Sequence, residues 1–167
     1  MKSGFIGVIG KANAGKSTLV NVLVGEKVSI VSPKPQTTRD AVMGVLTKPE
    51  YQLVFMDTPG IYKAQNRLSD MMQKTAQTAA KDVDFLLFVH DGHGGISADD
   101  IQLMQKYLSG KIPMAIAYTK IDIMPKERIL DDVKTLYENG ITCDVLPVSA
   151  RKFTNVSKLE AYLADKM

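Results

Sequence analysis

Short apolar runs alternate along this chain with segments whose apolar residues recur every three or four positions. A continuous apolar run between turn residues is typical of a buried strand, and the longer spacing is typical of a helix with one buried face. The runs predict strands at residues 5–9, 42–46, 51–56, 85–90, 114–118 and 145–148. The periodic segments predict helices at residues 18–24, 68–81, 97–110, 125–139 and 155–166.

Turn and cap residues agree with these boundaries. Ser97 precedes two acidic residues and is a typical helix N-cap. Pro125 stands at the start of the next helix, where proline is favoured, and Asn139-Gly140 is a typical C-terminal cap. Strands and helices alternate except at Lys48–Glu50, where two strands meet in a hairpin. This order predicts a three-layer α/β fold with a six-stranded, mostly parallel sheet and one antiparallel edge strand.

Composition sets the limits of the function. The 167 residues suit one domain, 1–167, and the net charge is +3. This mildly basic charge permits contact with nucleic acid or peripheral association with an acidic membrane, but it demands neither. The single cysteine, Cys143, cannot form an internal disulfide, so we expect a cytoplasmic location and a buried, inert thiol. No signal-peptide pattern precedes the first strand, and the longest apolar run, residues 83–89, is too short for a transmembrane segment.

The first predicted strand leads into a glycine-rich phosphate-binding motif. Residues 10–17 read GKANAGKS and fit G-x-x-x-x-G-K-[ST], between a strand and a helix as a P-loop requires. Backbone N–H groups and the helix N-terminus favour an anion here, Lys16 would reach the β- and γ-phosphates, and the Ser17 hydroxyl would bind Mg²⁺. The predicted phosphate-binding residues are Gly10, Lys11, Ala12, Asn13, Ala14, Gly15, Lys16, Ser17 and Thr18.

A D-x-x-G motif follows the strand after the hairpin. We expect Asp57 to hold Mg²⁺, with Thr58 and Pro59 beside the nucleotide and the Gly60 N–H on the γ-phosphate. The chain holds a second match, Asp91-Gly92-His93-Gly94. Its position after a different strand favours an ordinary turn, and the neighbouring histidines are expected to be structural rather than metal-binding.

Two further motifs indicate a guanine base. Thr119-Lys120-Ile121-Asp122 fits [NT]-K-x-D, in which a buried carboxylate would accept the N1–H and 2-amino protons that adenine lacks. The Lys120 stem would lie over the base. Ser149-Ala150-Arg151 follows the last strand, where the Ala150 N–H would bind guanine O6. The plainer alternative for the first motif is a surface lysine and a helix-capping aspartate.

Residues 25–41 show no period and carry two prolines, which predicts a long exposed loop. A threonine hydroxyl there would complete the Mg²⁺ shell and sense the γ-phosphate, and we prefer Thr38 over Thr37. Solvent-exposed threonines are the alternative. Arg39 is expected to lie on the surface or to stabilise the loop rather than to act as an arginine finger.

The motifs occur in the order found in the translation-factor-related GTPases. Residues 32–39, SPKPQTTR, and 60–68, GIYKAQNRL, resemble the two switch regions of the bacterial Era family. The resemblance covers nearly the whole chain and implies a Ras-like P-loop GTPase domain of a ribosome-assembly factor. It also implies small-subunit rRNA as a partner through a C-terminal KH domain, which this chain is expected to lack because only one helix follows Arg151.

Two positions depart from common GTPase patterns. Era-like proteins usually have asparagine where this chain has Thr119, and a hydroxyl offers fewer donors to tie this loop to the P-loop. Ile61 stands where Ras-type enzymes have the glutamine that orients water, although an apolar residue there fits the Era family.

Asn13 matches the P-loop asparagine that binds K⁺ in potassium-activated relatives. An asparagine that serves only the loop's own hydrogen bonds is the alternative.

Together these patterns predict a Mg²⁺-dependent GTPase with slow turnover that acts as a conformational switch. The expected catalytic residues are Lys16, Thr38, Gly60 and Asn13, and the expected Mg²⁺ ligands are Ser17, Thr38 and Asp57, with K⁺ as a further candidate cation. One alternative is a GTP-binding module with negligible hydrolysis. The other is an ATP-dependent P-loop kinase, against which Asp122 argues.

Overall fold

The computed structural model describes residues 2–11, 14–25, 42–57 and 83–167. These residues form a six-stranded sheet in the order β2-β3-β1-β4-β5-β6. The strands are β1 (Lys2–Ile9), β2 (Val42–Thr47), β3 (Tyr51–Asp57), β4 (Phe85–Asp91), β5 (Met114–Thr119) and β6 (Val145–Pro147). The helices are α1 (Lys16–Val24), α3 (Ala98–Leu108), α4 (Lys126–Glu138) and α5 (Val156–Asp165), with short 3₁₀ turns η2 (Gly92–Gly94) and η3 (Ile121–Ile123).

The sheet is parallel except at one edge. β2 pairs antiparallel with β3, and the described neighbours from β3 to β6 pair in parallel. The hairpin is closed by a hydrogen bond in which the Lys48 N–H donates to the Tyr51 carbonyl at 2.9 Å. The predicted fold class, including the antiparallel edge strand, is confirmed.

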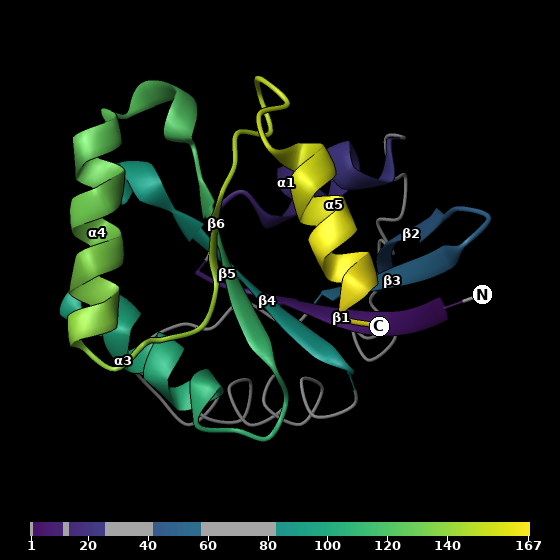
Figure 1. Cartoon of the computed structure of the whole chain (residues 1–167), viewed down its shortest axis with the longest axis horizontal. Coiled ribbons are helices and arrows are strands. Elements are labelled where there is room, and N and C mark those ends of the chain that lie inside the picture. The colour runs from purple at the N-terminus through teal and green to yellow at the C-terminus, as the bar shows by residue number, and fades with distance from the viewer. Residues whose placement is uncertain (1, 12–13, 26–41, 58–82) are drawn as a thin grey trace, which may run out of the picture.

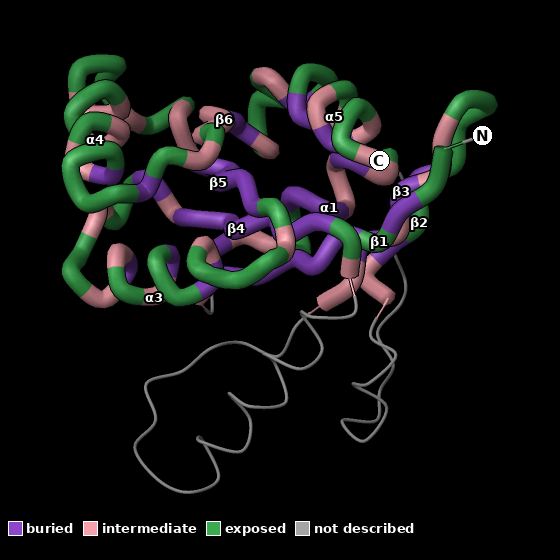
Figure 2. The backbone as a smooth tube through the Cα atoms, turned by 60° about the horizontal axis from the view of Figure 1, so that its bottom comes forward, coloured by how far each residue is buried: buried purple, intermediate pink, exposed green. Residues whose placement is uncertain are grey.

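Helices cover both faces of the sheet (Figure 1). Leu19 of α1 and Leu159 of α5 belong to the core on one face, which also includes Leu87, whereas Met104 of α3 and Leu136 of α4 belong to the core on the other. Successive residues of β4 contribute to the two cores in turn, because side chains of a strand alternate between faces. The central strands are buried and the helices carry the exposed surface (Figure 2). This explains why β4 and β5 have continuous apolar sequences.

Most predicted boundaries lie within one or two residues of the observed ones, but β1 begins at Lys2 rather than Phe5. Its first residues pair only with β3, since pairing with β4 begins at Ile6. Lys2 and Ser3 are exposed, so this part of the strand has no apolar signature. Cys143 precedes β6 and is half-buried rather than fully buried, and burial raises the pKa of its thiol. The helix predicted at 68–81 lies outside the described residues.

Candidate functional site

The loops singled out by sequence meet at the carboxyl edge of the sheet. In the parallel register Val8 lies opposite Asp57, and Asp91 lies opposite Thr119. The P-loop follows β1 directly, and Ser149 comes just after β6. Ligands of open parallel sheets bind beyond this edge. The described motifs therefore lie together as predicted.

The P-loop backbone needs glycine at two described positions. Gly10 has φ of 144°, and a Cβ there would lie 2.4 Å from the Val89 carbonyl oxygen. Gly15 adopts the left-handed conformation with φ of 95° and forms the N-cap of α1. Residues other than glycine are strained at such φ values. These glycines let the loop lie against β4 and turn into the helix.

The N-terminus of α1 is open toward this edge. Gly15 provides no side chain to cap it, and the first turn holds no acidic residue. By contrast, α3 has a capping box in which Ser97 and Asp100 bond each other's backbone N–H groups at 3.1 and 2.8 Å. Ser97 is thus confirmed as an N-cap. Because uncapped N–H groups and the helix dipole favour an anion, the start of α1, which follows the glycine-rich loop, is suited to receive a phosphate.

Lys16 stands at this helix start and donates from Nζ to the Gly10 carbonyl at 2.9 Å. Burial lowers the pKa of Lys16, while the nearby Asp57 carboxylate opposes the shift. Burial likewise raises the pKa of Asp57, and Lys16 opposes it. The attraction between Lys16 and Asp57 thus does not fully offset the cost of burying either charge. An added anion near Lys16 and a cation near Asp57 would relieve this cost.

A second part of the site is a cavity of about 290 Å³ next to the P-loop. Its lining combines the start of α1 with both base-recognition motifs. The residues are Gly15, Thr18, Leu19, Thr119, Lys120, Asp122, Ile123, Ala150 and Arg151. The structure therefore brings the phosphate loop and the [NT]-K-x-D and Ser-Ala-Arg segments to one pocket.

Asp122 is held in this pocket by a partner that the sequence did not reveal. The Ser149 hydroxyl donates to Asp122 Oδ1 at 2.8 Å, and Ser149 is fully buried. The hydroxyl oxygen of Ser149 also accepts the Lys152 N–H at 3.1 Å. Asp122 itself is exposed, so the expectation of a buried carboxylate is wrong. Its place in the short turn η3 leaves it at the pocket surface.

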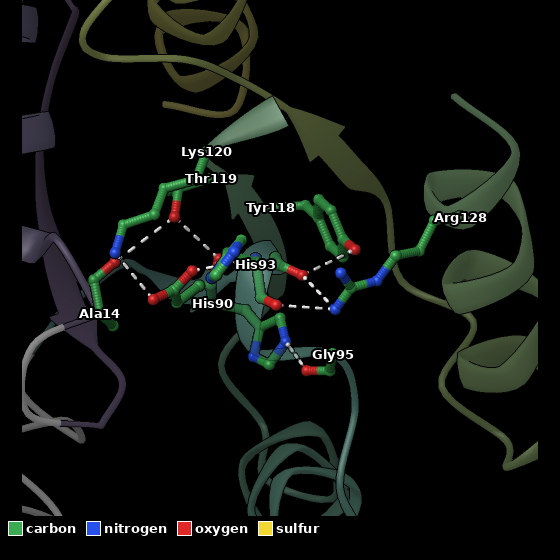
Figure 3. A network of polar contacts seen from close by, with 10 residues as sticks. Ala14, His90, His93, Gly95, Tyr118, Thr119, Lys120 and Arg128 are labelled. Carbon is green, nitrogen blue, oxygen red and sulfur yellow. Dashed lines mark hydrogen bonds and ion pairs between the residues drawn. The ribbon is translucent and has the colours of Figure 1, made fainter. Parts of the chain in front are cut away.

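Thr119 links the two halves of the site. Its hydroxyl lies 3.0 Å from the His90 carbonyl oxygen and 3.4 Å from that of Ala14 in the P-loop (Figure 3). Thr119 is 4% exposed, so both contacts are shielded from water. The hydroxyl has one proton for the two acceptors. The tie to the P-loop expected of this position is present, and its longer contact is the weaker one.

The second D-x-x-G match is more than an ordinary turn. Asp91 ends β4, its Oδ1 accepts the His93 N–H at 3.0 Å, and its Oδ2 pairs with Lys120 Nζ at 2.8 Å. The plain-turn interpretation is therefore incomplete. The sequence signal for this role was the second D-x-x-G motif at the end of a strand. The partner, Lys120, follows a different strand, β5, so the pairing is not visible in the sequence.

The histidines and Lys11 have structural partners. His90 Nε2 lies 2.7 Å from the Gly95 carbonyl oxygen, so this nitrogen carries the proton. His93 belongs to η2. Lys11 of the P-loop forms an ion pair with Asp100 at 2.6 Å, which ties the loop to the start of α3. The sequence pattern indicates only that Asp100 favours the start of this helix, and the pairing with Lys11 is not visible in it.

Several predicted site residues lie outside the described residues and stay predictions. They are Ala12, Asn13, Thr37, Thr38, Arg39, Thr58, Pro59, Gly60 and Ile61. Within the described ranges, no helix has the length and apolar character of a membrane span.

Comparisons with known proteins agree with this geometry. The model of the 50S ribosome-binding GTPase family matches residues 5–120. GTPase Era of Clostridium novyi is 44% identical over 158 residues, which cover 95% of this chain and 54% of that protein. The chain thus spans about half the length of the curated relatives it matches.

Solved structures give the same result. A crystal structure of Era in complex with MgGDPNP and nucleotides 1506–1542 of 16S ribosomal RNA matches with a TM-score of 0.82 and 35% identity, over 99% of this chain and 57% of that one. An Aquifex aeolicus Era variant bound to GDP·AlF4⁻ matches with a TM-score of 0.83 and 34% identity, over 100% of this chain and 57% of that one. The chain belongs to the 50S ribosome-binding GTPase family, in which it is similar to the GTPase Era proteins.

Proposed function

We propose that this chain binds GTP and hydrolyses it to GDP and phosphate, as one GTPase domain spanning residues 1–167. The observation that carries the proposal is the shared pocket, in which Gly15 and Thr18 of the phosphate-binding segment line one cavity with Asp122. A nucleotide whose phosphates lie on the P-loop would thus present its base to the carboxylate that Ser149 holds. A carboxylate at that point favours guanine over adenine.

The phosphate end of the site follows from charge. Lys16 and the open N-terminus of α1 would bind the phosphates, and the Gly60 N–H would contact the γ-phosphate. Hydroxyl and carboxylate oxygens are the ligands that Mg²⁺ prefers, so Ser17, Asp57 and Thr38 would hold it. The bound ion would neutralise negative charge between the β- and γ-phosphates. Asn13 would hold K⁺ in the same region.

Asp122→Asn tests the base assignment. The amide can donate to the 2-oxo group of xanthine but cannot accept both the N1–H and the 2-amino protons of guanine as a carboxylate does. We expect affinity for GDP to fall at least about tenfold and affinity for xanthosine diphosphate to rise. Asp131→Asn is the matched control, because it removes the same charge from an exposed site on α4 and should change neither affinity. An unchanged preference for GDP in Asp122→Asn would refute the assignment.

The alternative is a GTP-binding module that does not hydrolyse. Single-turnover release of phosphate from pre-bound GTP, with and without Mg²⁺, distinguishes the two. We expect slow hydrolysis that requires Mg²⁺ and is lost in Lys16→Ala. Release at the rate of the protein-free control would favour the module.

We further propose that the chain is cytoplasmic and that it binds the small ribosomal subunit and its rRNA. Similarity to an Era protein crystallised with 16S ribosomal RNA supports this, and the net charge of +3 permits it. Co-sedimentation of the chain with small subunits, with GDP or a non-hydrolysable GTP analogue, tests it. The same assay with vesicles of acidic lipid tests peripheral membrane association.

A further inference from the structure

We propose that Asp91 is a positioning residue for the nucleotide base, acting by holding Lys120 along the wall of the base pocket. This inference rests on the proposed function, since it assumes that the pocket lined by Lys120 and Asp122 receives the base. It gives a role to the second D-x-x-G match, which neither the phosphate loop nor the base-recognition motifs include.

Lys120 has a strained backbone and a long side chain that only a partner can hold in one position. Its backbone is left-handed, with φ of 64°, a conformation that non-glycine residues adopt at a cost. It precedes η3, the turn that carries Asp122. The side chain runs from the end of β5 to Asp91 at the end of β4, where its Nζ donates to the carboxylate at 2.8 Å (Figure 3). The ion pair therefore fixes the far end of a long side chain whose stem borders the pocket.

Asp91 is itself held rigidly. Its other oxygen caps η2 through the His93 N–H. Arg128 of α4 clamps the same turn, donating from Nη2 to the carbonyls of His93 at 2.7 Å and of Gly92 at 3.3 Å. A Cβ at Gly92 would lie 2.3 Å from the Tyr118 ring, so the turn packs closely against β5. Asp91 is thus a fixed anchor for Lys120.

Charge is consistent with this role. Burial raises the pKa of Asp91, but the hydrogen bond and charge of Lys120, together with the His93 N–H and the nearby His90, more than offset it, so the pKa lies below its ordinary value. The side chains of Lys120 and Asp91 are 43% and 29% exposed, which places the pair in the range of partly screened surface ion pairs. Loss of such a pair corresponds to about a two- to fivefold change in affinity.

Asp91→Asn isolates the effect, because asparagine caps η2 as well as aspartate does but carries no charge for Lys120. Affinities for GDP and for a non-hydrolysable GTP analogue are measured by titration in four proteins: the wild type, Asp91→Asn, Lys120→Met and the double variant. We expect Asp91→Asn to weaken both nucleotides about two- to fivefold and by the same factor, since both share the base. In the Lys120→Met background the same change should weaken neither.

Two control variants separate the ion pair from a general change in charge or in the turn. Asp131→Asn removes an equal charge from α4 and should bind both nucleotides as the wild type does. Asp91→Glu keeps the charge that pairs with Lys120, so it should bind both nucleotides more tightly than Asp91→Asn does. Thermal unfolding of each variant shows whether it is folded. Because salt screens such a pair, the ratio of the Asp91→Asn and wild-type dissociation constants should approach one in about 1 M salt.

The outcomes separate this inference from the proposed function. If Asp122→Asn exchanges guanine for xanthine but Asp91→Asn has no effect, or has an equal effect with and without Lys120, the positioning role is refuted and the GTP site stands. If the wild type binds no guanine nucleotide, the proposed function fails and this inference fails with it.

Discussion

Thr119 offers the sharpest test of how the site is held together. Its buried hydroxyl serves the His90 carbonyl at 3.0 Å and the Ala14 carbonyl at 3.4 Å with one proton. Thr119→Val keeps the shape and removes the donor. The P-loop and the base-recognition loop then lose this direct contact.

The magnitude follows from burial. A buried carbonyl that loses its donor costs about 1–3 kcal/mol, and the His90 contact is the shorter of the two. For a domain of this size that corresponds to a melting temperature lower by about 3–10 °C. Looser ordering of the P-loop adds about 0.5–1.5 kcal/mol to the cost of binding, or a roughly two- to tenfold weaker affinity for GDP.

Thr119→Asn tests the same contacts in the opposite sense. An amide carries two N–H donors, one for each carbonyl, so it should bind GDP as tightly as the wild type or up to about fivefold more tightly. Thermal unfolding and calorimetric titration with GDP measure both variants. Thr135→Val is the control, because it also removes a threonine hydroxyl that bonds a backbone carbonyl, at 3.0 Å on α4 away from the pocket.

One result would refute the reasoning. If Thr119→Val melts at a lower temperature but binds GDP with unchanged affinity, the contact with Ala14 carries no energy. The Thr119 hydroxyl would then stabilise the fold only through its bond to the His90 carbonyl at the end of β4. Equal behaviour of Thr119→Val and Thr135→Val in both assays would refute the structural role as well.

Three further predictions concern stability and cations. Phe153 is 70% exposed and its backbone is left-handed, with φ of 57°. Phe153→Gly should relieve about 1–2 kcal/mol of backbone strain and lose about 0.5–1 kcal/mol to the greater entropy of the unfolded chain. We therefore expect the melting temperature to rise by about 1–4 °C. Burial raises the pKa of Asp100, but hydrogen bonds from Lys11 and Ser97 bring it below its ordinary value. The stability that Asp100 contributes is therefore present above about pH 4 and lost as pH falls through the lower folded pKa, so Asp100→Asn should lose less stability in acid denaturation. GTP turnover should be faster in KCl than in NaCl at equal ionic strength if Asn13 holds K⁺, and equal rates would refute it.

Much of the fold is predictable from sequence because its strongest signals are local. The continuous apolar run of β4 reflects burial on both faces, and the caps at Ser97 and Asn139 mark helix ends within a few residues. The start of β1 was not predictable, since Lys2 and Ser3 gain their strand conformation from pairing with β3 alone. A pairing partner some fifty residues away leaves no trace in the apolar pattern.

The site divides in the same way. Motif spacing predicted that Lys16, Asp57, Thr119, Asp122 and Ser149 lie at one sheet edge, because loops after parallel strands converge there. Spacing did not predict their side-chain partners. The bond from Ser149 to Asp122 joins two segments that are separate in sequence, and it is possible only because β5 and β6 are neighbours.

Lys11, Lys16 and Lys120 differ in which groups balance their charges, and this difference predicts different roles for them. Lys11 and Lys120 each meet a carboxylate, Asp100 at 2.6 Å and Asp91 at 2.8 Å, and these pairs fix the positions of loops. Lys16 instead bonds a neutral carbonyl, and burial lowers its pKa despite Asp57. A phosphate that reaches Lys16 would reverse that shift, so part of the desolvation cost already borne by the folded chain would be recovered on binding. We therefore expect Lys11 and Lys120 to hold their loops in place through their carboxylate partners, and the desolvated Lys16 to attract phosphate.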